Sequence, residues 1–174
     1  MDAVLLDTDV FSYLTKSNDS RGVAYRPHVE GKTVAISFVT VGELYFGVEN
    51  KKWGERTVRE LLERLKAVVI VPYDTEICKT YGNLKAPLRK AGVVVSDNDL
   101  WIAACAVRHS IPLISNNRKH FEKIPRLRLI SEAPEKTAAV PVTEQLFAAQ
   151  SSEKSAESSG QQIKHKAKPE PLDD

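Results

Sequence analysis

Apolar runs and stretches with helical spacing alternate along the first 130 residues of the chain. A short apolar run predicts a strand, and apolar residues three and four positions apart predict a helix. The predicted strands are VLLD (4–7), TVAIS (33–37), VVIVP (68–72), IPLIS (111–115) and LRLIS (127–131). The predicted helices cover residues 10–15, 20–29, 39–50, 55–67, 74–92 and 97–110.

This alternation predicts an α/β fold, a three-layer α/β/α sandwich with a central parallel sheet. The β-branched run at 68–72 is typical of a strand covered on both faces. The helix at 97–110 is almost wholly apolar and is therefore expected to be buried. From residue 132 onward the chain is rich in Ser, Glu, Lys and Gln. We therefore predict one domain at residues 1–131 and a polar, disordered tail at 132–174.

The composition is that of an ordinary globular protein, with 42% hydrophobic and 28% charged residues. No apolar stretch is long enough to predict a membrane span, and no secretory signal is visible. Cys78 and Cys105 form no CxxC pair and are expected to be small, reduced core residues, which favours the cytoplasm. Residues 131–174 carry eight acidic and five basic side chains, so the first 130 carry 15 and 20. That mildly basic region suits a polyanionic partner.

Polar side chains follow the predicted strands at the points where the strands end. Asp7 ends the first strand, and Glu43 lies one turn into the helix after the second. Ligands of parallel sheets bind beyond the carboxyl ends of the strands, and oxygen ligands suit Mg²⁺ or Mn²⁺. The other polar residues near these ends are Asp97, Asp99, Ser115, Asn116 and Asn117.

Helix capping explains the same acids equally well, one at a time. Ser96 with Asp99, and Thr40 with Glu43, both have the spacing of a capping box. Asp9 could cap a helix that begins at Val10. Taken together, however, three carboxylates at one sheet edge would repel one another unless a cation or shared protons compensated their charge.

Four segments carry a resemblance to a known family. They are LLDTDVFSYL, ISFVTVGELYFGV, DNDLWIAACAVRHSIPLISNN and RKHFEKIPRLRLI. In order and spacing they resemble the motifs of PIN-domain ribonucleases over residues 3–130, and most closely those of VapC-type toxins from type II toxin–antitoxin systems. The resemblance implies the α/β/α sandwich, an Mg²⁺ or Mn²⁺ ion held by acidic side chains, and RNA cleavage that leaves 5′-phosphate and 3′-hydroxyl ends.

The resemblance also implies roles for individual residues. Asp7, Glu43 and Asp99 match the family's three core acids, with Asp7 and Asp99 as the metal ligands. The family often has a fourth acid where this chain has Asn117 or His120, so a second ion is expected to bind weakly. The remaining candidates support the site, with Asp97 as an additional acid; they are Thr8, Asp97, Ser115, Asn116 and Asn117.

The leading interpretation is a metal-dependent endoribonuclease, the toxin of a toxin–antitoxin pair. The resemblance implies an RNA substrate, a small antitoxin protein and a homodimer. Apolar residues of two helices could help to form the antitoxin's groove, namely Leu44, Tyr45, Phe46, Leu61 and Leu62. Two alternatives stay open. Asp7-x-Asp9 after a strand also resembles the first motif of haloacid-dehalogenase-like phosphatases. The missing fourth acid is also consistent with a catalytically weak PIN-like domain that only binds RNA or protein.

Overall fold

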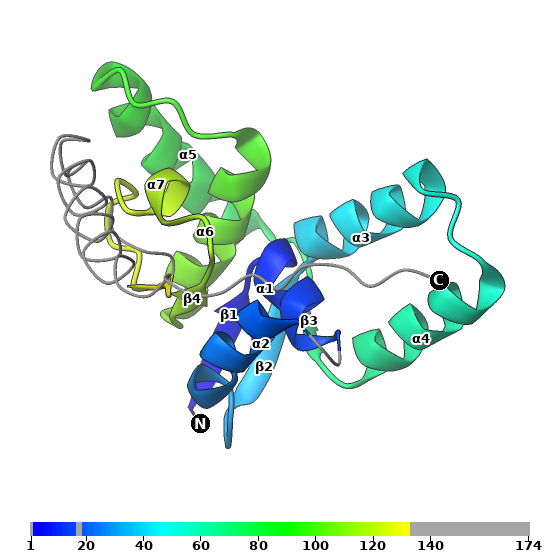
Figure 1. Cartoon of the computed structure of the whole chain (residues 1–174). Coiled ribbons are helices and arrows are strands. Elements are labelled where there is room, and N and C mark those ends of the chain that lie inside the picture. The colour runs from blue at the N-terminus through cyan, green and yellow to red at the C-terminus, as the bar shows by residue number, and fades with distance from the viewer. Residues whose placement is uncertain (1, 17–18, 133–174) are drawn as a thin grey trace, which may run out of the picture. The chain divides into compact units, whose positions relative to one another are not determined.

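A five-stranded parallel sheet organises the domain (Figure 1). The structure is a computed structural model and describes residues 2–16 and 19–132. The sheet has the order β3-β2-β1-β4-β5, and every neighbouring pair is parallel. The strands are β1 (Ala3–Leu6), β2 (Thr33–Ser37), β3 (Val69–Val71), β4 (Leu113–Ile114) and β5 (Leu129–Ile130). All five predicted strands are therefore confirmed.

Helices connect the strands, close to where their spacing predicted them. Six of the segments expected to be helical are helical, and α5 continues through Pro87 to Lys90. The short α7 was not predicted, because one turn is too short to show a periodic pattern. The helices are α1 (Thr8–Leu14), α2 (Ser20–Tyr25), the 3₁₀ turn η1 (Arg26–His28), α3 (Phe38–Asn50), α4 (Glu55–Lys66), α5 (Thr75–Lys90), α6 (Asp97–His109) and α7 (Arg118–Phe121).

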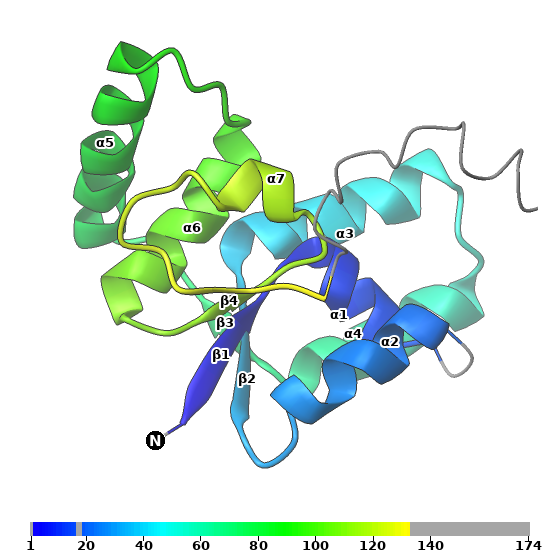
Figure 2. The same ribbon diagram turned by 60° about the vertical axis from the view of Figure 1, so that its left-hand side comes forward.

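The sheet separates two hydrophobic cores, as a three-layer sandwich requires. Side chains alternate along each strand, so Leu5 packs with one core while Val4 and Leu6 pack with the other. The first core contains residues of α5, α6 and α7, and the second contains residues of α1, α2, α3 and α4. Figure 2 shows α5 and α6 on one side of the strands and α1 and α2 on the other. The predicted α/β/α architecture and the burial of α6 are confirmed.

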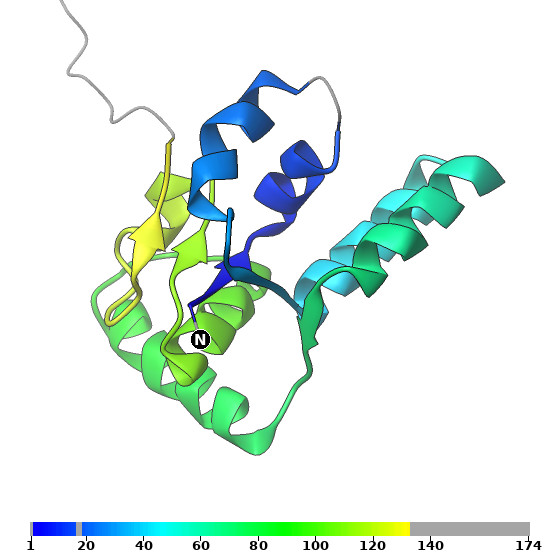
Figure 3. The ribbon, with the colours of Figure 1, turned by 90° about the horizontal axis from the view of Figure 1, so that it is seen from below.

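The prediction that the run at 68–72 forms a fully covered strand is wrong. β3 is an edge strand that pairs only with β2, and Val69 and Ile70 are 52% and 43% exposed. The helices α3 and α4 run side by side away from the sheet (Figure 3). A β-branched run fits any pleated strand, and its composition does not reveal whether the strand lies at an edge.

Three further expectations have mixed outcomes. Cys105 is buried, and its burial raises the pKa of the thiol to about 12, whereas Cys78 is exposed and is not a core residue. Among the described residues, no helix combines the length and apolar character that crossing a bilayer requires. The domain boundary after residue 131 and the tail at 132–174 stay predictions, since residues 133–174 lie outside the described part of the chain.

Candidate active site

Asp7 lies at the carboxyl end of β1, where it is almost completely buried (6% exposed). It caps α1, since its Oδ1 accepts a hydrogen bond of 2.7 Å from the backbone N–H of Thr8. Its Oδ2 accepts a second bond of 2.7 Å from Ser115 Oγ, at the end of β4. The expectation that Asp9 caps this helix is wrong: Asp9 lies exposed in the first turn, because α1 begins two residues earlier than predicted.

The surroundings of Asp7 oppose its negative charge. The pKa of the carboxyl group is raised from 3.8 to about 6, mainly by burial and in part by the nearby charges of Asp9 and Asp99. The hydrogen bonds from Ser115 and Thr8 act in the opposite direction but are outweighed. A buried acid with other acids near it is an environment that a cation would stabilise.

Glu43 is held at both carboxylate oxygens. The Thr8 hydroxyl donates to Oε2, and Asn98 Nδ2 donates to Oε1 over 2.8 Å. The expected capping box of Thr40 and Glu43 is wrong, because Ser37 caps α3 and accepts from the Thr40 N–H at 3.0 Å. The Glu43 side chain therefore has no capping role and reaches across from α3 to α1 and α6.

Asp99 lies in the first turn of α6, and the sequence predicted one half of the capping box at the start of this helix. Ser96 Oγ accepts from the Asp99 N–H at 3.1 Å and caps α6 as expected. The carboxylate of Asp99 contacts a different residue, with its Oδ2 3.0 Å from His120 Nδ1. The same Nδ1 lies 2.7 Å from Asn117 Nδ2. Asn117 precedes α7 but makes no side-chain capping bond to it.

Asp97 has its own cation. Its Oδ1 lies 2.6 Å from Lys85 Nζ and accepts a bond of 2.8 Å from Tyr81 OH. The Lys85 and Tyr81 bonds hold the pKa of the Asp97 carboxyl below its usual range. The Asp97 carboxylate is therefore bonded to side chains of α5. It does not supply the negative charge that a fourth acid would have added to the site.

The polar residues that follow β4 form hydrogen bonds in two directions, toward Asp7 and toward α2. Ser115 Oγ donates to Asp7 and also accepts from the Asn117 N–H at 3.0 Å. Asn116 Oδ1 accepts from Tyr25 OH at 3.1 Å, which directs this amide toward α2. Asn98 was not predicted as a site residue, although it lies inside the predicted Ser96–Asp99 helix start. His120 was considered only as a position without the expected acid, although it follows Asn117 by one helical turn.

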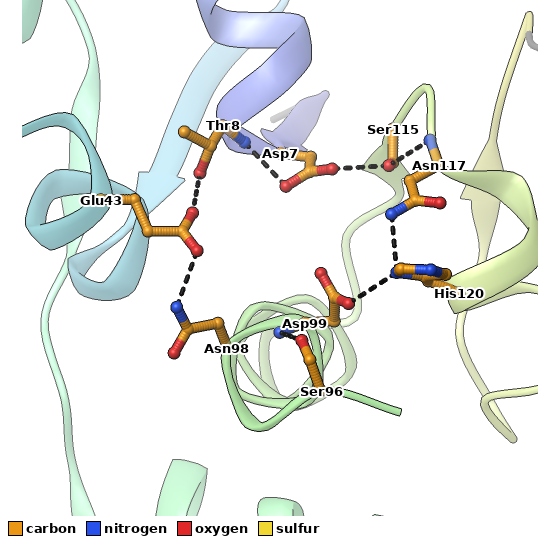
Figure 4. A network of polar contacts seen from close by, with 9 residues as sticks. All are labelled: Asp7, Thr8, Glu43, Ser96, Asn98, Asp99, Ser115, Asn117 and His120. Carbon is orange, nitrogen blue, oxygen red and sulfur yellow. Dashed lines mark hydrogen bonds and ion pairs between the residues drawn. The ribbon is translucent and has the colours of Figure 1, made fainter. Parts of the chain in front are cut away.

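The three core acids face one space. Figure 4 shows Asp7, Glu43 and Asp99 arriving from three directions with their carboxylates turned toward a common centre. Across residues 2–16 and 19–132, no lysine or arginine forms an ion pair with any of the three. In the described part of the chain the one basic side chain that contacts these acids is therefore the His120 imidazole, beside Asp99.

The donor set fits a hydrated divalent ion. In that part of the chain, no three His, Cys, Asp or Glu side chains are grouped closely enough to enclose a metal by themselves. Mg²⁺ does not require such a cage, since it keeps several waters and binds through one or two carboxylates together with substrate phosphates. Asp7 and Asp99 provide two such carboxylates. The Thr8 N–H and Ser115 orient the oxygens of Asp7, and Asn98 orients the carboxylate of Glu43.

Comparisons with known proteins bear on the family and the fold of the chain. The family profile described as the PIN domain matches residues 4–127. Ribonuclease VapC2 of Haemophilus influenzae is 33% identical over 124 residues, which cover 71% of this chain and 93% of that protein. The structure of VapBC2 from Rickettsia felis, bound to a DNA fragment from their promoter, matches with a TM-score of 0.66 and 28% identity over 74% of this chain and 98% of that one. VapBC-1 from nontypeable H. influenzae matches with a TM-score of 0.65 and 29% identity over 74% and 97%.

Proposed function

The chain belongs to the PIN-domain family, and on that premise we propose that it is an endoribonuclease, dependent on Mg²⁺ or Mn²⁺, that acts as the toxin of a toxin–antitoxin pair. Its relatives named above are a VapC ribonuclease and two VapBC complexes. The observation that carries the proposal is the buried Asp7 carboxyl, which faces Asp99 and Glu43 without a lysine or arginine partner in the described part of the chain.

The proposed mechanism assigns a task to each acid. Asp7 and Asp99 would hold the ion, and Ser115 and the Thr8 N–H fix the two oxygens of Asp7. The chemistry that such an ion would supply is acidification of the attacking water and neutralisation of charge on the phosphate. Glu43, fixed by Thr8 and Asn98, orients the attacking water and accepts its proton. Attack in line with the leaving 3′-oxygen gives 5′-phosphate and 3′-hydroxyl products.

Each alternative has a distinct weakness. The haloacid-dehalogenase-like phosphatase would leave Glu43 without a role, and the PIN-domain match over residues 4–127 favours the nuclease. A catalytically weak binding domain would not need to keep a buried carboxylate such as Asp7, whose burial opposes its charge. The nuclease accounts for all three acids at once.

Cleavage of RNA by the purified protein tests the proposal. Short single-stranded RNAs are incubated with EDTA, Mg²⁺ or Mn²⁺, and the ends of the products are mapped. We expect cleavage only with a divalent ion, 5′-phosphate ends, and no cleavage by Asp7→Asn. Cleavage in EDTA would contradict the metal role. RNA binding without cleavage under every condition would favour the binding domain, and release of phosphate from a monoester by the wild type would favour the phosphatase.

The proposed protein partner is a small antitoxin, and we also propose a homodimer and a cytoplasmic location. Of the five apolar residues expected in the antitoxin groove, Leu44 and Leu61 are buried in the core. The other three are exposed and form the candidate surface: Tyr45 (44%), Phe46 (69%) and Leu62 (39%). An apolar surface on the α3–α4 pair suits a protein partner more than it suits a phosphate backbone.

Co-purification tests the partner. The protein is expressed with the product of the neighbouring reading frame, and the complex is measured by light scattering. We expect a stable complex that contains two copies of this chain and that no longer cleaves RNA. Phe46→Ser should weaken the complex without changing metal-dependent cleavage by the free protein. A monomer that does not bind its neighbour's product would contradict the toxin–antitoxin role and leave the nuclease unaffected.

A further inference from the structure

His120 occupies one of the two positions at which the family resemblance places a fourth acid, and Asn117 occupies the other. Its imidazole is 43% exposed, and its Nδ1 points into the space between Asp99 and Asn117 (Figure 4). The Nδ1 atom lies 3.0 Å from Asp99 Oδ2 and 2.7 Å from Asn117 Nδ2. The two contacts make different demands on the same ring nitrogen.

The position of the imidazole proton decides which neighbour Nδ1 can bond. Asn117 Nδ2 can only donate, so that contact requires Nδ1 to accept, whereas the Asp99 carboxylate accepts and requires Nδ1 to donate. When the ring proton is on Nε2, Nδ1 presents a lone pair beside the Asp99 carboxylate. A metal ion placed beside the two atoms can then bind both.

The separation of the two atoms suits a hydrogen bond and equally suits two neighbouring ligands of one metal ion. An octahedral ion with ligands at about 2.1 Å holds neighbouring ligands about 3.0 Å apart. The observed 3.0 Å between His120 Nδ1 and Asp99 Oδ2 therefore lets one ion bind both with little movement.

We propose that His120 binds the same ion as Asp99 through Nδ1, and that this nitrogen shifts the site's preference from Mg²⁺ toward first-row transition ions such as Mn²⁺ and Co²⁺. Imidazole nitrogen suits transition metals, whereas Mg²⁺ prefers oxygen ligands. In the tautomer that accepts from Asn117, Nδ1 keeps the lone pair that the ion would bind. The inference rests on the proposed metal-dependent nuclease and adds a third protein ligand to Asp7 and Asp99.

Pulsed electron paramagnetic resonance of bound Mn²⁺ tests the ligand directly, because a coordinated imidazole produces a ¹⁴N modulation. We expect the modulation in the wild type and its loss in His120→Asp and His120→Ala. His109→Ala is the matched control, because His109 is exposed at the other end of α6, and it should keep the modulation. Circular dichroism shows whether each variant is folded, so that loss of the signal is not loss of the fold.

Calorimetric titration tests the preference. The ratio of Mn²⁺ affinity to Mg²⁺ affinity should fall at least about tenfold in His120→Asp, which exchanges nitrogen for oxygen, and Co²⁺ should bind the wild type more tightly than Mn²⁺. Bound Mn²⁺ without nitrogen modulation, or an unchanged ratio, would overturn this inference while metal-dependent cleavage stood. Failure of the wild type to bind Mn²⁺ would overturn it as well, and cleavage that persists in EDTA would overturn the proposed function itself.

Discussion

Two acids two residues apart at the start of α6 have opposite surroundings. Asp97 is exposed and is paired with Lys85, so the chain itself compensates its charge. Asp99 is only 16% exposed, faces Asp7 and Glu43, and has an imidazole as its nearest basic group. The position of an acid in the sequence therefore does not indicate its role. What distinguishes the two acids is whether a basic side chain of the same chain balances the negative charge. The charge of Asp97 is balanced by Lys85 of the same chain, whereas the acids grouped around Asp99 are suited to binding a cation from solution.

The contrast extends to stability. The Asp97–Lys85 pair lies on the surface, where ion pairs contribute little to folding. Asp7 is buried beside like charges, and its raised pKa shows that the fold is less stable when this group is ionised. The site therefore opposes stability in the metal-free protein, which is common where function dictates the residues.

The largest expected difference is in catalysis. Asp99→Asn removes a proposed metal ligand and should lower the rate of metal-dependent RNA cleavage by about a thousandfold or more. Asp97→Asn, on the same helix turn, should leave the rate within about threefold, because surface ion pairs have little effect. Initial cleavage rates at saturating Mn²⁺ measure both. Equal losses in the two variants would remove the distinction between the two acids.

The next largest effect is on folding and depends on pH. Asp7 has a pKa of about 6 in the folded protein and 3.8 as its ordinary value. Between these values the unfolded chain has lost the proton that the folded chain keeps, so the free energy of unfolding falls as pH rises, and it levels off above pH 6. The loss has an upper limit of about 3 kcal/mol.

Asp7→Asn removes this pH-dependent loss. Without metal, the variant should be more stable than the wild type at pH 8, by up to about 3 kcal/mol, and similar to it at pH 4. Urea unfolding in EDTA at the two pH values measures the difference. Mn²⁺ should then stabilise the wild type but not the variant. A difference that is the same at both pH values would show that Asp7 ionisation is not its cause.

A smaller effect is expected from two serines that both accept from a backbone N–H. Ser115 Oγ also donates to the buried Asp7 carboxylate, so Ser115→Ala should cost about 2 kcal/mol at pH 8, with a smaller loss at pH 4. Ser96 caps α6, so Ser96→Ala should cost about 1 kcal/mol with little dependence on pH. Urea unfolding of both variants compares them. Identical pH dependence would contradict the pairing of Ser115 with ionised Asp7.

The sequence predicted the elements of the fold better than the contacts between them. β2 begins and ends at the predicted residues, because an apolar run with clear ends is a local signal. Whether a strand lies at the edge of a sheet depends on its neighbours in the fold and not on its own residues, so the exposure of β3 was not predicted. Which acid caps α1 was also missed, since Asp7 and Asp9 both precede apolar helical positions and only the true helix start distinguishes them.

The convergence of the three acids was predicted from their positions along the chain. Asp7, Glu43 and Asp99 were chosen because they follow strands or open a helix, and the structure turns their side chains to one space. Asn98 and His120 were missed because their contacts join residues 55 and 21 positions apart. Asp97 was included because a sequence does not show that Lys85, one element earlier, takes its charge.

Binding of Mn²⁺ to the metal-free protein tests the central claim most directly, since the free ion gives a solution resonance that bound Mn²⁺ lacks. The titration compares the wild type with Asp99→Asn and Asp97→Asn. We expect the wild type and Asp97→Asn to bind one ion with the same affinity, and Asp99→Asn to bind at least about tenfold more weakly. Unchanged binding by Asp99→Asn, or an equal loss in Asp97→Asn, would contradict the claim that the acids without a cation of their own form the metal site.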